Sequence, residues 1–151
     1  MLSCQWKRAW ARPMSSVRIR IKNEKKEDQT MNEKFLEVLK HEGPVTIVTI
    51  NGNPAHVVNT WMSYVSRKDD ELYIPAAGMH SIEGDFAKDN HVLLTFGSKE
   101  VEGTVGPGAG FHVFGTGRFV DQGPAFAAKK EKFPWLTRLL IVHVDEVQQK
   151  I

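Results

Sequence analysis

The chain has very little cysteine and no long apolar run. Its 151 residues include a single cysteine, Cys4, which excludes an internal disulfide framework and a metal site built from several cysteines. No stretch approaches the ~18 apolar residues that a membrane-spanning helix needs, and no apolar segment of the kind found in secretory signals follows the N-terminus. The scarcity of cysteine fits an intracellular, reducing compartment, and we expect a cytoplasmic protein.

Acidic residues are absent from the first 23 positions. Residues 1–30 hold eight Lys/Arg and three Asp/Glu, whereas residues 31–151 hold twelve and fifteen. The mildly acidic remainder therefore gives no electrostatic support for nucleic-acid binding. We expect residues 1–30 to be a basic, disordered extension, or the product of an upstream start codon. An organelle-targeting segment, or an edge strand over residues 17–21, is the alternative.

Residues 31–151 predict one mostly β domain with peripheral helices. A capping box at Thr30 and Glu33 opens a helix that ends near Gly43. Two more short helices are expected over residues 81–88 and 123–132, the latter with a proline at its favoured first position. Alternating and β-branched segments predict six strands, at residues 45–50, 55–64, 71–75, 91–96, 111–120 and 139–144. Their short connections favour an antiparallel closed sheet.

Familiar nucleotide, hydrolase and metal motifs are missing. The glycine-rich segment 103–117 does not match G-x-G-x-x-G, because Phe111 and Val113 stand where glycine is required, and no phosphate-loop or G-x-S-x-G motif occurs. Tight turns and close backbone contacts explain these glycines better than a loop lying on a ligand does. The six histidines lack metal-binding spacing, so a zinc or iron site is not expected.

Two short segments combine side chains that suit a ligand. Asn59-Thr60-Trp61-Met62-Ser63-Tyr64 places polar groups beside two aromatic rings at a predicted strand end. The rings can wall a flat ring system, the alternative being that they belong to the core. Gly78-Met79-His80-Ser81 opens a short helix whose free N–H groups can hold a phosphate. Ser81 suits either the N-cap position or a hydrogen bond to that phosphate. Together the segments indicate a flavin nucleotide.

Several pieces in a fixed order carry a family resemblance: Phe35 to Gly43, Val58 to Trp61 with Ser63-Tyr64, Gly78 to His80, Leu93 to Ser98, Gly106 to Gly108 with Gly110-Phe111, Gly123-Pro124, and Trp135. Through them residues 31–151 resemble the FMN-binding split-barrel family. That family includes pyridoxamine 5'-phosphate oxidase-like proteins and the small FMN-binding proteins of sulfate-reducing bacteria.

The resemblance implies a six-stranded antiparallel split β-barrel, a homodimer, and one FMN per subunit near the dimer interface. It implies that the flavin is lined by Asn59, Thr60 and Trp61, with Tyr64 close by and Glu42 near the ring. Gly78, Met79 and His80 would lie beside the phosphate. Trp135 and the terminal Ile151 would approach the flavin from the partner subunit.

The chain departs from the family pattern after Gly-Met-His, where Lys-Thr is replaced by Ser81-Ile82. A cation next to the expected phosphate is lost, and Lys99 and Arg118 are the candidates to replace it. The resemblance favours a flavoprotein that acts in electron transfer or in another flavin-dependent redox reaction. Such a protein needs no catalytic acid or base. An oxidase or reductase of a small molecule is the alternative, disfavoured because no Arg/Lys cluster lies near the motifs. A cofactor-free dimeric scaffold is the third hypothesis.

Overall fold

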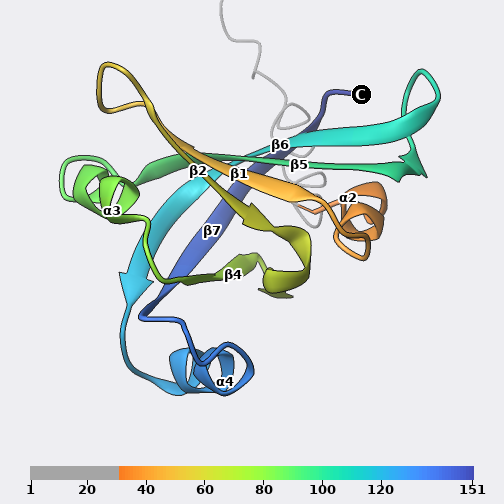
Figure 1. Ribbon diagram of the computed structural model, residues 1–151. Helices are drawn as coiled ribbons and strands as arrows, with labels where there is room; N and C mark the ends of the chain where they lie inside the picture. Colours follow the sequence, from red (N-terminus) through yellow and green to blue (C-terminus); the bar gives the residue numbers. More distant parts are fainter. Residues whose placement is uncertain (1–30) are drawn as a thin grey trace, which may run out of the picture.

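The segments rich in β-branched and aromatic residues form a single curled antiparallel sheet (Figure 1). The computed structural model describes residues 31–151, so the expectations for residues 1–30 lie outside the described residues. The elements follow in the order α2 (Glu33–Val38), β1 (Pro44–Thr49), β2 (His56–Trp61), the 3-10 helix η1 (Met62–Tyr64), β3 (Ser66–Lys68), β4 (Glu71–Ala76), α3 (His80–Phe86), β5 (His91–Glu102), β6 (Pro107–Val120), α4 (Pro124–Lys132) and β7 (Arg138–Gln149).

The strands lie in the order β2-β1-β5-β6-β7-β4-β3, and every neighbouring pair is antiparallel. Within residues 31–151 no ladder joins the edge strands β2 and β3. The sheet is therefore a curled half-barrel and not the closed sheet that we expected. The mostly β class with peripheral helices is confirmed, but the strand number is seven because Ser66–Lys68, expected as part of a turn, pairs with Glu71–Tyr73.

The glycine-rich segment 103–117 forms the turn after β5 and most of β6. A methyl group on Gly103 would lie 2.0 Å from the carbonyl oxygen of Gly108, and one on Gly115 would lie 2.1 Å from that of His143. Side chains do not fit at such distances, so the backbones of the β5–β6 hairpin and of β7 approach closely only because these positions are glycine. The structural explanation of these glycines is confirmed.

Helix α2 begins two residues later than its capping box predicts. Asn32 is the N-cap, because its Oδ1 accepts a hydrogen bond from the backbone N–H of Phe35 at 2.8 Å. Thr30 lies outside the described residues. The Phe35 ring is fully buried, with its centroid 5.2 Å from that of Phe96 and 5.5 Å from that of Phe111. These edge-on contacts fix the helix against the sheet.

A second, smaller core lies beneath α4. Phe133, Leu136, Leu139 and Ile141 are buried there, and Tyr64, Tyr73 and Phe126 pack against them. This cluster joins the end of η1 to the start of β7, and it therefore positions two of the residues expected at the flavin. None of the helices within residues 31–151 has the length and apolar character needed to cross a bilayer.

Candidate functional site

The end of β2 presents one large ring to solvent. The Trp61 side chain is 53% exposed, and Asn59 on the same face of the strand accepts a 2.9 Å hydrogen bond at Oδ1 from the Thr46 hydroxyl. Thr60 points the other way and is nearly buried, so its side chain does not lie on the face that carries Trp61. The alternative that Trp61 belongs to the core is wrong, and this indole is available to stack on a flat ring.

Glu42 holds the turn that follows Trp61. Its Oε1 accepts hydrogen bonds from the backbone N–H groups of Gly43 at 3.0 Å and Ser63 at 3.2 Å. Hydrogen bonding from Ser63, followed by that from Gly43, lowers the pKa of the Glu42 carboxyl. Glu42 is therefore an anion that fixes η1, and through it the relative placement of Trp61 and Tyr64.

Tyr64 and Trp135, distant in the sequence, lie in one aromatic cluster. The Tyr64 ring is centred 5.4 Å from Trp135 and 5.1 Å from Phe133, and the last two are 5.6 Å apart. Tyr64 is half-buried, so the core interpretation holds for part of its ring, whereas Trp135 is exposed. The structure thus brings these two predicted flavin residues together within one chain.

The segment Gly78–Ser81 lies at the N-terminal end of α3, as expected, but its capping differs from the prediction. Met79 is the N-cap residue, with φ of 66° and no side-chain hydrogen bond. Ser81 lies inside the first turn and is exposed, so its assignment as the N-cap is wrong. Its hydroxyl remains available for a ligand.

Arg138, which the sequence did not single out, lies beside this loop. Its Nη2 donates to the carbonyl oxygen of Gly78 and lies 3.5 Å from Nδ1 of His80. Its Nη1 lies 2.6 Å from Oε2 of Glu83. This nitrogen is buried, and no group among the described residues forms a hydrogen bond of good geometry with it. The guanidinium is thus a cation beside the Gly78 loop with donors left for a further partner.

The segment from Trp135 to Arg138 connects the aromatic cluster to the Gly78 loop. Three extended residues span at most about 10 Å, and Thr137 fixes the segment by donating from its backbone N–H to Ala76 at 2.9 Å and from its hydroxyl to Ala77 at 3.1 Å. The aromatic cluster and the Gly78 loop therefore lie within the length of one small ligand. This arrangement fits a molecule that carries a flat ring at one end and a phosphate at the other.

The orientation of α3, and so of the loop before it, depends on a buried carboxylate. Asp85 Oδ2 accepts hydrogen bonds from the Thr49 hydroxyl at 2.5 Å and from Nδ1 of His56 at 2.7 Å. Hydrogen bonding from Thr49, followed by that from His56, lowers the pKa of Asp85. The ionised carboxylate ties the helix to β1 and β2.

Ile151 lies three strands away from Trp61 within one chain. Its carbonyl oxygen accepts from the backbone N–H of Gly110 at 3.2 Å, and a methyl group on Gly110 would lie 2.9 Å from Ile151 Cγ1. Gly110 is on β6, three strands from Trp61 on β2, a separation of roughly 14 Å at the usual strand spacing. The C-terminus and the β5–β6 hairpin lie at the same end of the sheet (Figure 1).

The cations do not lie where the sequence placed them. Arg118 pairs with Glu71 at 2.9 Å, and Lys99 is exposed on β5; Arg138 is the cation that contacts the Gly78 loop. The expectation that no Arg/Lys cluster lies near the motifs is also wrong. Lys129 donates from Nζ to the carbonyl oxygen of Tyr64 at 2.6 Å, and Arg67, Lys68 and Lys132 line the same hollow as Lys129.

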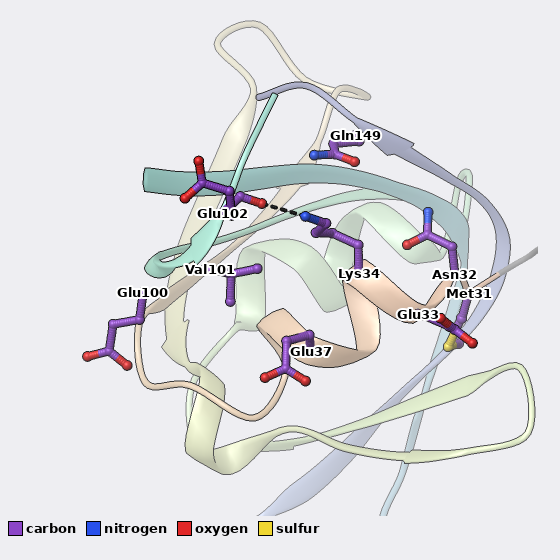
Figure 2. A pocket seen from close by; sticks show the side chains of 9 residues that line it. All are labelled: Met31, Asn32, Glu33, Lys34, Glu37, Glu100, Val101, Glu102 and Gln149. Carbon is purple, nitrogen blue, oxygen red and sulfur yellow. Dashed lines mark hydrogen bonds between the residues drawn. The ribbon is translucent and has the colours of Figure 1, made fainter. Parts of the chain in front are cut away.

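A larger hollow of about 900 Å³ lies elsewhere, between α2 and the β5–β6 hairpin. Figure 2 shows Lys34 reaching toward the backbone carbonyl of Glu102, a hydrogen bond of 2.7 Å. Four glutamates line the hollow, together with Met31, Asn32, Lys34, Val101 and Gln149. None of the residues predicted to hold the cofactor is among them, and the carboxylates would repel a phosphate.

The curled half-barrel, with an exposed aromatic strand end and a loop at a short helix, defines the split-barrel class of β proteins. No protein-family model matches the chain. The chain is 41% identical over 118 residues to the FMN-binding protein of Nitratidesulfovibrio vulgaris, which covers 78% of this chain and 96% of that protein. The chain therefore belongs to the family of this FMN-binding protein, as the resemblance predicted.

Solved structures agree on the fold. A pyridoxamine 5'-phosphate oxidase-like protein of Lactobacillus delbrueckii superposes with a TM-score of 0.60 at 11% identity, over 81% of this chain and 97% of its own. An FMN-binding protein of Syntrophomonas wolfei superposes with a TM-score of 0.56 at 13% identity, over 71% of this chain and 76% of its own. At this identity the likeness supports the split-barrel fold alone.

Proposed function

We propose that the chain binds one FMN per subunit and uses it in electron transfer. One observation carries the proposal. The segment from Trp135 to Arg138 connects the Tyr64–Trp135 ring pair to the Gly78–Ser81 loop, which Arg138 contacts. The 41% identity to the FMN-binding protein of Nitratidesulfovibrio vulgaris, over nearly the whole of that protein, supports the same cofactor. When bound, FMN supplies the redox chemistry, and the protein supplies binding, orientation and electrostatics.

The flavin ring would lie against the exposed Trp61 indole, with Tyr64 and Trp135 nearby and Asn59 as a polar partner. The phosphate would be held by Arg138, by backbone N–H groups of the Gly78 loop and by the Ser81 hydroxyl. Because Arg138 already has a carboxylate neighbour in Glu83, phosphate and carboxylate would share one guanidinium. Its five donors permit this.

Electron transfer requires no acid or base from the protein. The ionisable groups nearest the aromatic cluster already have structural partners, since Glu42 accepts from two backbone N–H groups and Lys129 donates to Tyr64. The alternative function is that of an oxidase or reductase of a small molecule. The hollow lined by Arg67, Lys68, Lys129 and Lys132 favours it, because such an enzyme needs a substrate pocket beside the flavin.

The protein acts as a homodimer in this proposal. On the face of the sheet that carries Trp61, residues 31–151 leave a cross-strand row of apolar residues only partly covered, and the row continues to Ile50, which is 79% exposed. The row follows the strand register and consists of Val57, Val48, Leu93 and Phe114. A second copy would bury this row, and it would supply the C-terminal Ile151 that lies too far from Trp61 in the same chain.

We place the protein in the cytoplasm. The single cysteine supports a reducing compartment. Fractionation of cells that express the full chain would test this location, and recovery in an organelle would favour the targeting role of the basic residues 1–30.

A visible spectrum tests the cofactor. The purified full chain should be yellow, with a flavin absorbance band that bleaches on reduction and returns with an acceptor. If the protein is colourless and its spectrum is unchanged when FMN is added, FMN binding and both redox functions are wrong, and the cofactor-free scaffold is left.

A further inference from the structure

A hollow of about 480 Å³ lies between β3 and α4 and is walled by cations. No carboxylate is among its lining residues, which are Ser66, Arg67, Lys68, Tyr73, Pro124, Ala125, Ala128, Lys129 and Lys132. Within residues 31–151 none of its four cationic side chains forms an ion pair. The concentration of uncompensated positive charge in a concave site is the electrostatic condition for binding an anion.

One face of α4 forms the inner wall of the hollow. Ala125, Ala128, Lys129 and Lys132 are spaced by three and four residues, so they share one side of the helix. The two alanines leave room that longer side chains would fill. Arg67 and Lys68 of β3 line the hollow as well, and Ala125 and Ala128 form its apolar floor.

Lys129 is fixed at the back of this hollow. The residue is 9% exposed, its Nζ donates to the Tyr64 carbonyl oxygen at 2.6 Å, and the ammonium lies 5.2 Å from the centre of the Phe133 ring. Burial, and to a smaller extent the charge of Lys132, lower the pKa of Lys129 to about 8. It is thus protonated at neutral pH, and two of its three donors remain for a ligand.

The hollow adjoins the aromatic cluster. Lys129 donates to the backbone carbonyl oxygen of Tyr64, and the Tyr64 ring packs on Trp135. The acidic residues nearby are Asp69, Asp70 and Glu71, which line a separate hollow of about 320 Å³ that shares Lys68 and Tyr73. Of these two hollows, Arg67 and Lys132 line the cationic one and not the acidic one.

We propose that the hollow between β3 and α4 binds a small organic anion, a phosphate monoester or a carboxylate, and that this anion is the substrate in the alternative, oxidoreductase function. The charged group contacts Arg67, Lys68 and Lys132, and the apolar body lies against Ala125 and Ala128. The volume and the recessed position of Lys129 favour a small molecule over a protein surface. That the anion lies beside a flavin rests on the proposed function, whereas the binding of the anion does not.

Calorimetric titration of the FMN-saturated full chain, in a phosphate-free buffer, tests the proposal with phenyl phosphate, benzoate and inorganic phosphate. Phenyl phosphate or benzoate should bind more tightly than inorganic phosphate, because only they offer an apolar body to the alanine floor. The double variant Arg67→Ala/Lys132→Ala should weaken that binding roughly tenfold. The control Lys99→Ala/Lys150→Ala removes two exposed positive charges outside the hollow and should leave it unchanged.

Absence of binding by all three anions would overturn the inference, and so would an equal loss in both double variants, which would mean a general charge effect. Release of FMN by phenyl phosphate would assign the cations to the flavin phosphate and would also overturn it. A separate absorbance titration with FMN alone reports on the proposed function. Intact FMN binding without anion binding therefore rejects only the substrate site.

Discussion

The buried ammonium of Lys129 makes the stability of the fold depend on pH in a predictable direction. Its pKa in the folded protein is about 8, lowered from 10.5 chiefly by burial. An unfolded chain keeps that proton up to its ordinary pKa, so between about pH 8 and 10.5 the unfolded state binds more protons than the folded state. The free energy of unfolding must therefore rise with pH in this window.

The magnitude follows from the two pKa values. Between pH 7 and 9, proton release from folded Lys129 should raise the free energy of unfolding by about 1.3 kcal/mol, and below pH 7 the contribution should be nearly constant. The variant Lys129→Met removes this dependence. It also removes the hydrogen bond to Tyr64, but that loss shifts the variant's curve by a constant amount and leaves its slope unaffected.

The assay is urea unfolding at half-unit steps from pH 7 to 9, at one fixed saturating FMN concentration. The quantity to compare is the wild-type free energy minus that of Lys129→Met, so that groups common to both chains cancel. The exposed control Lys99→Met should follow the wild type. A difference curve that stays flat across the window would mean that Lys129 is not desolvated, and the assignment of a buried cation behind the hollow would be refuted.

Three further predictions concern the cofactor and the dimer. Arg138→Met should raise the Kd for FMN roughly tenfold to a hundredfold, because a charge-assisted hydrogen bond to the phosphate is lost, and Glu83→Gln should lower that Kd. Riboflavin has no phosphate, so in fluorescence titrations it should bind both variants as it binds the wild type. If the Kd values of FMN and riboflavin change in parallel, the assignment of Arg138 to the phosphate is wrong. Ser81→Ala should weaken FMN binding by about 1 kcal/mol without lowering the melting temperature of the apoprotein, since Ser81 is not the cap; an unchanged Kd removes Ser81 from the phosphate site. Val57→Asp should give a monomer in light scattering, whereas Val105→Asp, at a residue 95% exposed on the hairpin tip, should not; a dimeric Val57→Asp places the interface elsewhere.

Local sequence signals predicted the elements whose stability is itself local or strongly patterned. The β1–β2 hairpin follows from β-branched residues on both sides of the Asn51–Pro54 turn, and α4 begins at Pro124 as expected. The missed strand β3 has three exposed polar residues and no alternation. Its structure depends on backbone pairing with β4, and residue types carry no signal for such pairing.

The capping of α3 was missed for a related reason. Met79 adopts a left-handed conformation that branched or large residues rarely take, whereas serine, as at position 81, is a preferred N-cap residue. Hydrogen bonding from Arg138 to the Gly78 carbonyl helps to hold this loop. A contact 60 residues away in the chain thus determined a local conformation that local preferences would have assigned otherwise.

The cations show most clearly where reasoning from the sequence fails. Lys99 and Arg118 were considered because they follow the motifs in the chain, but adjacency in this sheet is set by the ladder that pairs Ala76 with Arg138. That pairing places a guanidinium beside Gly78, and the packing of α4 on β7 places Lys129 behind Tyr64. The argument against a substrate pocket relied on finding no Arg/Lys cluster near the motifs. Because the fold places Lys129 and Lys132 of α4 in one hollow with Arg67 and Lys68, the choice between an electron carrier and an oxidoreductase of a small anion depends on what that hollow binds.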